Sequence, residues 1–285
     1  MPLAKVKDIL KHAMENKYGV AAINTLNYET TRCAILAAER EKMPVIIQFY
    51  PGLDKYCPSR YIAYMAKDMA REATVPVAVH LDHSSTYDIA VSGIRDGFPS
   101  VMVDGSSLPY EENVRLTASV VKVARIFGVD VEAELGHVGA GSNLDDIINT
   151  DYYTDAEQAA DFVEHTGCDS LAIAVGHAHG NYVKKPDLDF ERIRKIRQAV
   201  SVPLVLHGCS GIPDEQMIEA VNLGLNKFNI ATEYFNAMYR SFQNQISNKA
   251  LDGNGIALMQ GIQEAMIEFV IGKIRLLNPN KFILR

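Results

Sequence analysis

The sequence predicts a single (β/α)8 barrel domain over residues 1–285, with a C-terminal helical extension from about residue 240. Eight short runs rich in apolar and β-branched residues recur along the chain, and longer segments with apolar residues at helical spacing separate them. Most positions of these runs are apolar, which is typical of the strands of a parallel sheet that is buried on both faces. No linker rich in glycine, proline or serine divides the chain, so we expect one domain.

The predicted strands account for the units of the barrel in turn. They are GVAAIN (19–24), PVIIQFY (44–50), VPVAVHLD (75–82), SVMVDG (100–105), VDVEAELG (129–136), SLAIAVG (170–176), VPLVLHG (202–208) and NKFNIAT (226–232). Helical segments such as residues 30–42 and 213–224 lie between them, and Pro213 stands where the first turn of a helix tolerates proline. Eight such units in 285 residues fit a closed barrel better than an open, doubly wound sheet.

The composition restricts the possible partners and the compartment. A net charge of −7 without any basic tract argues against nucleic acid and against an anionic membrane surface. The four cysteines are widely spaced, as in a reduced protein without a disulfide framework. Residues 1–19 have the pattern of an amphipathic helix rather than of a signal peptide, and no apolar run approaches ~18 residues. We therefore expect a cytoplasmic protein.

Histidines gather at one end of the predicted barrel. Active sites of this fold lie at the C-terminal ends of the strands, and six of the eight histidines fall at or just beyond those ends. A single histidine there is more often a hydrogen-bonded structural residue than a ligand. Three that converge from separate strands, beside carboxylates, favour a catalytic Zn²⁺ site with an open position for substrate. The candidate ligands are His83, His179 and His207, whereas His80, His137 and His177 are expected to support or pack.

The last two strands carry a signal for an anion. HGCSGIPDE (207–215) places Gly208, Ser210 and Gly211 directly before a predicted helix, where free backbone N–H groups and the helix dipole attract negative charge. NIATE (229–233) closes the eighth strand, and the loops after strands seven and eight form the usual phosphate site of this fold. A metal site and a phosphate site on one rim suggest metal-assisted chemistry on a sugar phosphate.

Asp82 lies next to a candidate zinc ligand and has two possible roles. It could exchange a proton with a hydroxyl group of the bound substrate. It could instead only orient His83 or His80 by accepting a hydrogen bond. We favour the first role.

Several motifs together resemble one family. HLDH, VMVDGSSLPYEEN, EAELG, AHG, LHGCSGIP and NIAT occur in the order and spacing found in class II ketose-bisphosphate aldolases, which include the fructose- and tagatose-bisphosphate aldolases. The resemblance runs from about residue 3 to about residue 240. It implies a zinc-dependent aldehyde-lyase of carbohydrate metabolism, such as glycolysis, with a (β/α)8 fold.

The resemblance assigns roles residue by residue. It implies that His83, His179 and His207 bind one catalytic Zn²⁺, and that Asp82 moves the proton at the C4 hydroxyl group. Zinc would polarise the C2 carbonyl group while the C3–C4 bond breaks. A second divalent or monovalent cation would be held by Asp104 and Glu134.

The resemblance also implies a pocket for dihydroxyacetone phosphate and an assembly. The expected partner is a small sugar phosphate, with neither nucleic acid nor membrane, and the expected state is a homodimer or homotetramer. The residues that match the phosphate-binding pocket of the family are Gly180, Gly208, Cys209, Ser210, Asn229, Ile230, Ala231 and Thr232.

The chain departs from the family pattern mainly on the side of the aldehyde. Tyr50 replaces a frequent serine, and Tyr182-Val183-Lys184 replaces a common Tyr-Lys-Gly. The long loop after the fifth strand reads GAGSNLDD (139–146), so its usual glutamate, the base for the C3 proton, falls near Ser142. Asp145 and Asp146 are possible substitutes.

These departures leave the substrate open. The expected reaction is reversible cleavage of tagatose or fructose 1,6-bisphosphate, and the main alternative is a family member that uses another acceptor aldehyde. A second alternative is a relative that binds sugar phosphate with little or no aldolase activity. A zinc hydrolase of the amidohydrolase type ranks low, because the first strand lacks a His-x-His motif.

Overall fold

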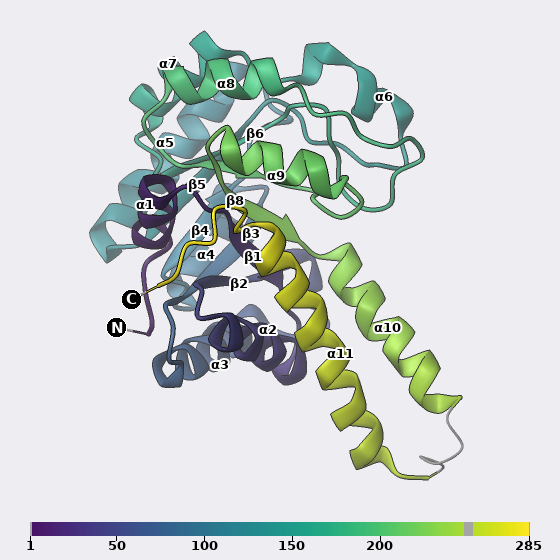
Figure 1. The fold of residues 1–285 in the computed structure, drawn as a ribbon. Helices are drawn as coiled ribbons and strands as arrows, with labels where there is room; N and C mark the ends of the chain where they lie inside the picture. Colours follow the sequence, from purple (N-terminus) through teal and green to yellow (C-terminus); the bar gives the residue numbers. More distant parts are fainter. Residues whose placement is uncertain (1, 248–252, 285) are drawn as a thin grey trace.

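The computed structural model describes residues 2–247 and 253–284 and confirms the predicted barrel. Eight parallel strands close on themselves in sequence order, β1 to β8, and helices surround them (Figure 1). Each predicted strand is present at nearly its predicted position. The strands are β1 (Val20–Asn24), β2 (Val45–Phe49), β3 (Val77–Ser84), β4 (Ser100–Val103), β5 (Asp130–Leu135), β6 (Ser170–Ile173), β7 (Leu204–Leu206) and β8 (Leu225–Ile230).

The helices follow the predicted alternation, with additional short helices in the loops after β2 and β5. Helix α2 begins with a capping box, in which Asn27 accepts from the Thr30 N–H and the Thr30 hydroxyl accepts from the Asn27 N–H. The helices are α1 (Val6–Asn16), α2 (Tyr28–Glu41), α3 (Ser59–Glu72), α4 (Tyr87–Arg95), α5 (Tyr110–Phe127), α6 (Leu144–Ile148), α7 (Ala156–Thr166), α8 (Phe190–Ala199), α9 (Asp214–Asn222), α10 (Thr232–Ile246) and α11 (Gly255–Leu276), with 3₁₀ turns η1 (Pro51–Leu53) and η2 (Thr150–Tyr152).

The interior of the barrel is polar near its C-terminal end, although every strand is buried. Residues two apart on a strand share a face, so a polar pair at that spacing fills the barrel lumen while its neighbours pack outward against helices. Such pairs are His80 and Asp82 on β3, Glu132 and Glu134 on β5, and Lys227 and Asn229 on β8; all are buried. The polar C-terminal layers of the lumen are the floor of the site described below.

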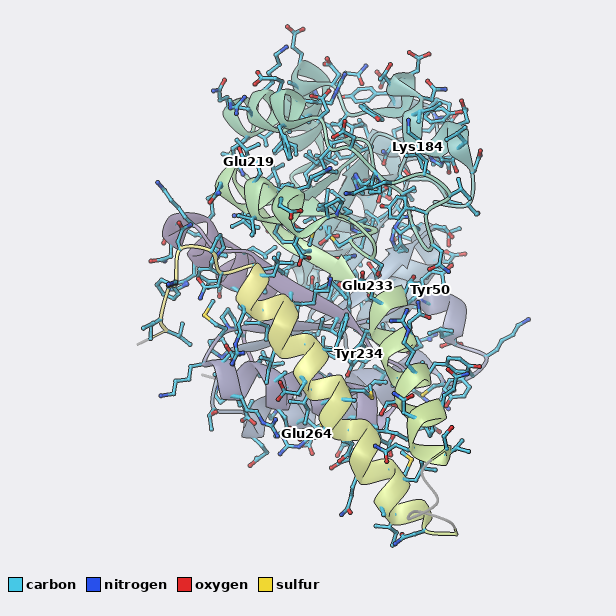
Figure 2. The ribbon with its side chains drawn as sticks, turned by 45° about the vertical axis from the view of Figure 1, so that its right-hand side comes forward. Tyr50, Lys184, Glu219, Glu233, Tyr234 and Glu264 are labelled. Atoms are coloured by element: carbon cyan, nitrogen blue, oxygen red, sulfur yellow. The ribbon has the colours of Figure 1, made fainter. Side chains whose placement is uncertain are left out.

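Helices α10 and α11 form a hairpin that extends beyond the barrel, with α11 lying along α2 (Figure 1). Tyr234 of α10 stacks on Phe269 of α11 at a ring distance of 6.0 Å, and Glu264 of α11 pairs with Arg40 of α2 at 2.7 Å (Figure 2). Helix α10 starts at Thr232, directly after β8, so residue 240 lies inside a continuous helix. No helix in the described part of the chain is long and apolar enough to cross a bilayer.

Candidate active site

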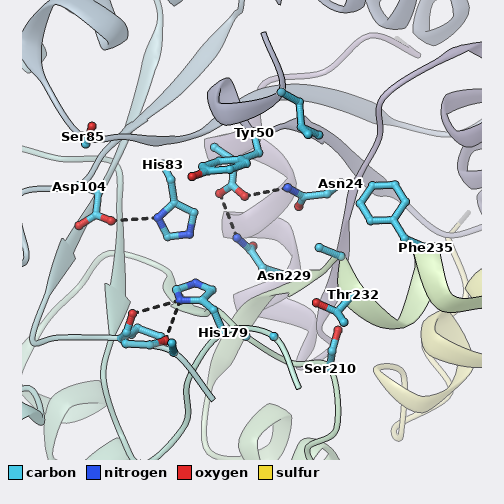
Figure 3. Close-up of a pocket in the computed structure, with 18 residues that line it drawn as sticks. Asn24, Tyr50, His83, Ser85, Asp104, His179, Ser210, Asn229, Thr232 and Phe235 are labelled. Atoms are coloured by element: carbon cyan, nitrogen blue, oxygen red, sulfur yellow. Dashed lines mark hydrogen bonds and ion pairs between the residues drawn. The ribbon is translucent and has the colours of Figure 1, made fainter. Parts of the chain in front are cut away.

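A cavity of about 660 Å³ opens at the C-terminal ends of the strands, where the sequence predicted the site (Figure 3). Most of the predicted site residues line it, and they come from separate strands and loops. His207 and Glu134 lie buried beside them, whereas Cys209, Ile230, Asp145 and Asp146 do not line the cavity. The predicted residues that do line it are Asp82, His83, Asp104, His179, Gly180, Gly208, Ser210, Asn229, Ala231 and Thr232.

An irregular backbone allows two neighbouring residues of β3 to serve the same cavity. Adjacent residues of a regular strand point to opposite faces, so Asp82 and His83 would diverge. His83 instead has φ of 41°, in the left-handed region that non-glycine residues rarely adopt, and the pairing of β3 with β4 shifts register between Leu81 and Ser84. Such irregularities re-aim side chains near active sites. Both side chains therefore line the cavity.

The three predicted ligand histidines converge, and a polar group orients each ring. One ring nitrogen of each lies within 4.8 Å of one ring nitrogen of both others. His83 Nδ1 lies 2.9 Å from Asp104 Oδ2, His179 Nδ1 lies 3.0 Å from the Val138 carbonyl oxygen, and His207 Nε2 lies 2.9 Å from Glu132 Oε1. These acceptors require an N–H at those positions. His83 Nε2, His179 Nε2 and His207 Nδ1 therefore carry the lone pairs.

This arrangement fits a metal ion. The buried His179 Nε2 has no hydrogen-bond partner, and His83 Nε2 lies only 2.8 Å from His207 Nδ1. Two lone pairs that face each other repel unless a proton or a cation lies between them. Three neutral imidazoles, each held through its other nitrogen by an oxygen acceptor, are a typical donor set for Zn²⁺.

A carboxylate cluster lies beside the histidines. Atoms of His83, Asp104 and Glu134 also lie within 4.8 Å of one another, and the buried Glu134 Oε2 has no partner. Burial and the Asp104 carboxylate raise the pKa of Glu134 well above its usual range. Burial alone would lower the pKa of His83, but Asp82, Asp104 and Glu134 raise it to about 9. These carboxylates therefore favour a positive charge beside them, either a proton on His83 or a metal ion that leaves the ring neutral.

Asp82 is held as an acceptor by three amide groups. Asn24 Nδ2 donates to Asp82 Oδ2 at 3.0 Å and Asn229 Nδ2 donates to Oδ1 at 3.1 Å (Figure 3). Gln48 Nε2 donates to Oδ2 as well, at 3.3 Å. Burial would raise the pKa of Asp82, but the imidazoles of His83 and His207 and the Lys227 ammonium group hold it below its usual range. A carboxylate has about four acceptor positions, so one remains for a substrate hydroxyl group.

A buried ion pair supports His207 and Asn229, and sequence reasoning missed it. Lys227 Nζ lies 2.9 Å from Glu132 Oε2 and 3.1 Å from Glu132 Oε1, and both side chains are fully buried. Lys227 Nζ also donates to Asn229 Oδ1 at 2.8 Å. The signal was available, because Lys227 lies two residues before Asn229 and Glu132 two before Glu134, so both had to enter the lumen.

The other rim histidines do not converge on the three ligands. His80 Nδ1 bonds Ser100 Oγ at 2.8 Å, and burial lowers its pKa to about 3. His177 is buried with neither ring nitrogen hydrogen-bonded, and burial lowers its pKa to about 3 as well. His137 lies in the loop after β5, with Nε2 4.0 Å from Asp146 Oδ1.

The loops after β6 and β7 are locked together at the predicted phosphate site. The Tyr182 hydroxyl accepts from the Ala178 N–H at 2.9 Å and lies 2.8 Å from the Gly208 carbonyl oxygen. Gly208 has φ of 53°, and a Cβ atom there would lie 2.0 Å from the Ala178 carbonyl oxygen. Only glycine permits this close approach of the two loops.

The start of α10 completes this side of the cavity. Thr232 is its first residue, and the Glu233 N–H donates to Ser210 Oγ at 3.1 Å. Glu233 Oε1 accepts from the Gly211 N–H at 3.0 Å, and Lys273 of α11 pairs with Glu233, which lies where α10 leaves the barrel (Figure 2). Ser210, Thr232 and the N-terminus of this 15-residue helix form an anion-favouring wall.

Two residues predicted for the phosphate pocket face elsewhere. Cys209 is buried, and its Sγ lies 3.2 Å from the Leu206 carbonyl oxygen. Ile230 is buried in the apolar core, because alternation on β8 directs Asn229 inward and Ile230 outward. Their side chains thus hold the loops in place rather than line the cavity.

The two candidate loop bases lie outside the cavity. Asp146 Oδ2 accepts from the Ala140 N–H at 2.7 Å, and its carboxyl group fills the space beside Gly139, where a Cβ atom would come within 2.2 Å of it. Asp145 is exposed and lies 3.2 Å from the Tyr152 hydroxyl group. In this structure both carboxylates organise the loop itself.

The chain is similar to known aldolases over nearly its whole length. The sequence model of the family described as fructose-bisphosphate aldolase class-II matches residues 4–281, so the similarity continues well beyond residue 240, through both C-terminal helices. The fructose-bisphosphate aldolase of Geobacillus stearothermophilus is 39% identical over 279 residues, which cover 96% of each chain. The YdjI protein of Escherichia coli (strain K12) is 41% identical over 275 residues, 96% of this chain and 97% of YdjI. The crystal structure of the YdjI aldolase superposes with a TM-score of 0.85 and covers 98% of each chain.

Proposed function

This chain belongs to the class II fructose-bisphosphate aldolase family and is a lyase, and we propose that it cleaves a ketose 1-phosphate or 1,6-bisphosphate reversibly to dihydroxyacetone phosphate and an aldehyde. The observation that carries this proposal is the convergence of His83, His179 and His207 beside Asp82. Tagatose or fructose 1,6-bisphosphate is the first substrate to test. The family resemblance also leads us to propose a dimer or tetramer, which sedimentation would test.

The histidines and Asp82 divide the work of the proposed reaction. His83, His179 and His207 would hold a Zn²⁺ ion, which when bound supplies a Lewis acid for the carbonyl group of the substrate. Asp82 accepts the proton of the C4 hydroxyl group as the C3–C4 bond breaks and returns it in the direction of synthesis. Its lowered pKa suits the first task, because cleavage requires the ionised carboxylate. Asp104 and Glu134 would hold the second cation.

The wall formed by the loops after β6, β7 and β8 would bind the phosphate of dihydroxyacetone phosphate. Gly180, Gly208, Ser210 and Thr232 line that part of the cavity. Backbone N–H groups, hydroxyl groups and the α10 dipole can hold a phosphate there without a cationic side chain.

Proton transfer at C3 requires a further base, because the carboxylates that line the cavity among the described residues, Asp82 and Asp104, have other proposed roles. Asp145 and Asp146 remain our candidates, and α6 would have to close toward the cavity before either carboxylate reached the substrate. The Ala140 N–H bond to Asp146 would then break, which is a small local cost for a loop.

A different acceptor aldehyde is the second candidate function, and one observation favours it. Within residues 2–247 and 253–284, no lysine or arginine lines the cavity, so a second phosphate group has no cation to pair with inside it. Arg60 and Arg95 line only the adjoining hollow on the other side of Tyr50. Tyr50 is 45% exposed and lies over the aldehyde side, with its ring 6.3 Å from that of His83. An aldehyde without a phosphate group fits this wall better.

Two measurements test the proposal. The zinc-loaded protein is expected to exchange a C3 proton of dihydroxyacetone phosphate with D₂O and to join this ketose to aldehydes in a screen. Zinc binding without any exchange would leave the binding-protein alternative. Equally fast cleavage of fructose and tagatose bisphosphates would count against the second candidate, and a Tyr50→Ser variant that gains activity toward phosphorylated aldehydes would support it.

A further inference from the structure

Lys227 lies deeper in the barrel than any residue expected to touch substrate. Its side chain is fully buried, and its ammonium group lies between β5 and β8, below the cavity. Burying a charge is costly unless it is paired and hydrogen-bonded. Lys227 has three N–H donors, and Glu132 Oε2, Glu132 Oε1 and Asn229 Oδ1 lie 2.9, 3.1 and 2.8 Å away. All its hydrogen-bonding capacity therefore goes to two side chains.

Each of these partners in turn holds one part of the reactive apparatus. Glu132 Oε1 accepts from His207 Nε2 at 2.9 Å, which leaves the lone pair of His207 Nδ1 facing His83. Asn229 Nδ2 lies 3.1 Å from Asp82 Oδ1, and its orientation is fixed because its Oδ1 accepts from Lys227. An amide group that rotated by 180° would offer Asp82 an oxygen in place of a donor.

We propose that Lys227 is a positioning residue that aligns the metal-binding ring of His207 through Glu132 and the proton-carrying carboxylate of Asp82 through Asn229. It touches neither substrate nor metal. This inference rests on the proposed function, and it adds a single buried side chain that couples the two halves of the chemistry.

Lys227 thus acts through two arms, one that reaches His207 through Glu132 and one that reaches Asp82 through Asn229. The two arms predict separable effects of Lys227→Met. Loss of a partner that orients a metal ligand weakens metal binding by about 10–100-fold. A displacement of Asp82 by about 1 Å lowers kcat by about 100-fold even when metal is saturating. If the role of Lys227 were purely structural, its replacement would lower the melting temperature and leave the metal affinity and the kcat of the folded protein unchanged.

The experiment uses the full chain loaded with zinc. Zinc affinity is measured by competition with a chromophoric chelator, the geometry of the site by Co²⁺ absorption, kcat at saturating zinc, and folding by thermal unfolding. The matched control is Lys67→Met. Lys67 is a partly buried lysine of helix α3, and its ammonium group bonds the Gly97 carbonyl oxygen at 2.7 Å. This control is expected to leave zinc affinity and kcat unchanged.

A double variant separates the arms and covers a failure of Lys227→Met to fold. Lys227→Met with Glu132→Gln leaves no uncompensated buried charge, and a glutamine oxygen can still accept from His207 Nε2–H. We expect zinc affinity to return close to that of the unchanged protein while kcat stays low, because Asn229 still lacks its partner. Recovery of kcat in the double variant would overturn the proposal, and so would a Lys227→Met protein with unchanged zinc affinity and kcat.

Failure of the proposed function itself would look different. In that case the unchanged protein would show no exchange of the C3 proton at all, whatever residue stands at position 227. The zinc affinities and Co²⁺ spectra of the variants would still decide the His207 arm.

Discussion

The side chains that β3, β7 and β8 bring to the site are fixed differently from those of the loop after β5. Asp82 of β3 and Asn229 of β8 are at most 6% exposed and bond to each other inside the lumen. Asp145 and Asp146 lie in a short helix that a few local hydrogen bonds hold, and Asp145 is exposed. The strand residues cannot move without breaking the sheet, whereas the short helix α6 can reorganise more readily. The start of the loop is tied to the site, because the Val138 carbonyl oxygen orients His179 and Ala140 pairs with His179.

This difference separates two requirements of one reaction. The atoms proposed to bind metal and to carry the C4 proton must keep their geometry within fractions of an ångström. Strand ends provide that for Asp82, His83 and His207, whereas His179 lies in a loop and is held by its bonds to the loop after β5. A base that must reach the substrate only after it binds can lie on a segment that moves. We therefore expect substitutions on strands to lower turnover strongly, and substitutions in the loop to change it modestly.

Removal of the metal should have the largest effect, because it takes away the Lewis acid on which the proposed cleavage depends. We expect chelation to abolish cleavage and zinc to restore it. Metal at 100 times its dissociation constant should also raise stability by about 2.7 kcal/mol, seen as a higher melting temperature. Full activity after the bound metal has been shown to be removed would refute the zinc assignment.

Asp82→Ala should have the next largest effect. Loss of a general acid–base group lowers kcat by about 10²–10⁴-fold, while zinc content should stay the same because Asp82 is not one of the three proposed ligands. Asp169→Ala is a suitable control, because that carboxylate pairs with Arg125 at the opposite end of the barrel. It should change stability only; undiminished cleavage by Asp82→Ala would remove its assigned role.

Tyr182→Phe tests the link between the loops after β6 and β7, which the Tyr182 hydroxyl group holds together. The hydroxyl group joins the Ala178 and Gly208 backbones, and loss of such buried bonds costs about 1–3 kcal/mol. We expect KM for the phosphorylated ketose to rise about tenfold or more, with a smaller change in kcat. Tyr152→Phe, whose hydroxyl group bonds only Asp145 among the described residues, is the comparison. Similar KM values for the two variants would show that the loop lock does not matter.

Asp146→Asn should have the smallest effect. An amide oxygen can still accept from the Ala140 N–H, so the loop should keep its shape. Asp145 then remains as the C3 base, and kcat should fall by only about a few-fold. Exchange of the C3 proton into D₂O is the sensitive readout. A fall by several orders of magnitude would instead identify Asp146 as the base.

The part of the site at the ends of the strands could be predicted from sequence to a large extent. Parallel strands fix where their C-terminal ends meet, so the ends marked by Asp82, His179 and His207 had to share one rim. The inward direction of Lys227 and Glu132 followed from the same alternation, but a buried lysine on a strand reads as an ordinary surface residue until its partner is seen. Register alone does not say which two lumen residues touch.

The loops could not be predicted in the same way. Whether Asp146 points into the cavity depends on hydrogen bonds such as that from Ala140, and no periodic pattern encodes them. Cys209 and Ile230 show a related limit, because a motif marks a segment of backbone and not the direction of each side chain. The left-handed backbone of His83 was equally invisible in the sequence.

That backbone has a consequence for any attempt to transplant this chemistry. A designer who copied His80 to His83 onto a regular strand of another barrel would obtain Asp82 and His83 on opposite sides of the wall. The recipient would need the irregular pairing between β3 and β4 as well as the four side chains. The unit that can be inherited or engineered is thus a pair of strands with a register shift between them, rather than the motif HLDH alone.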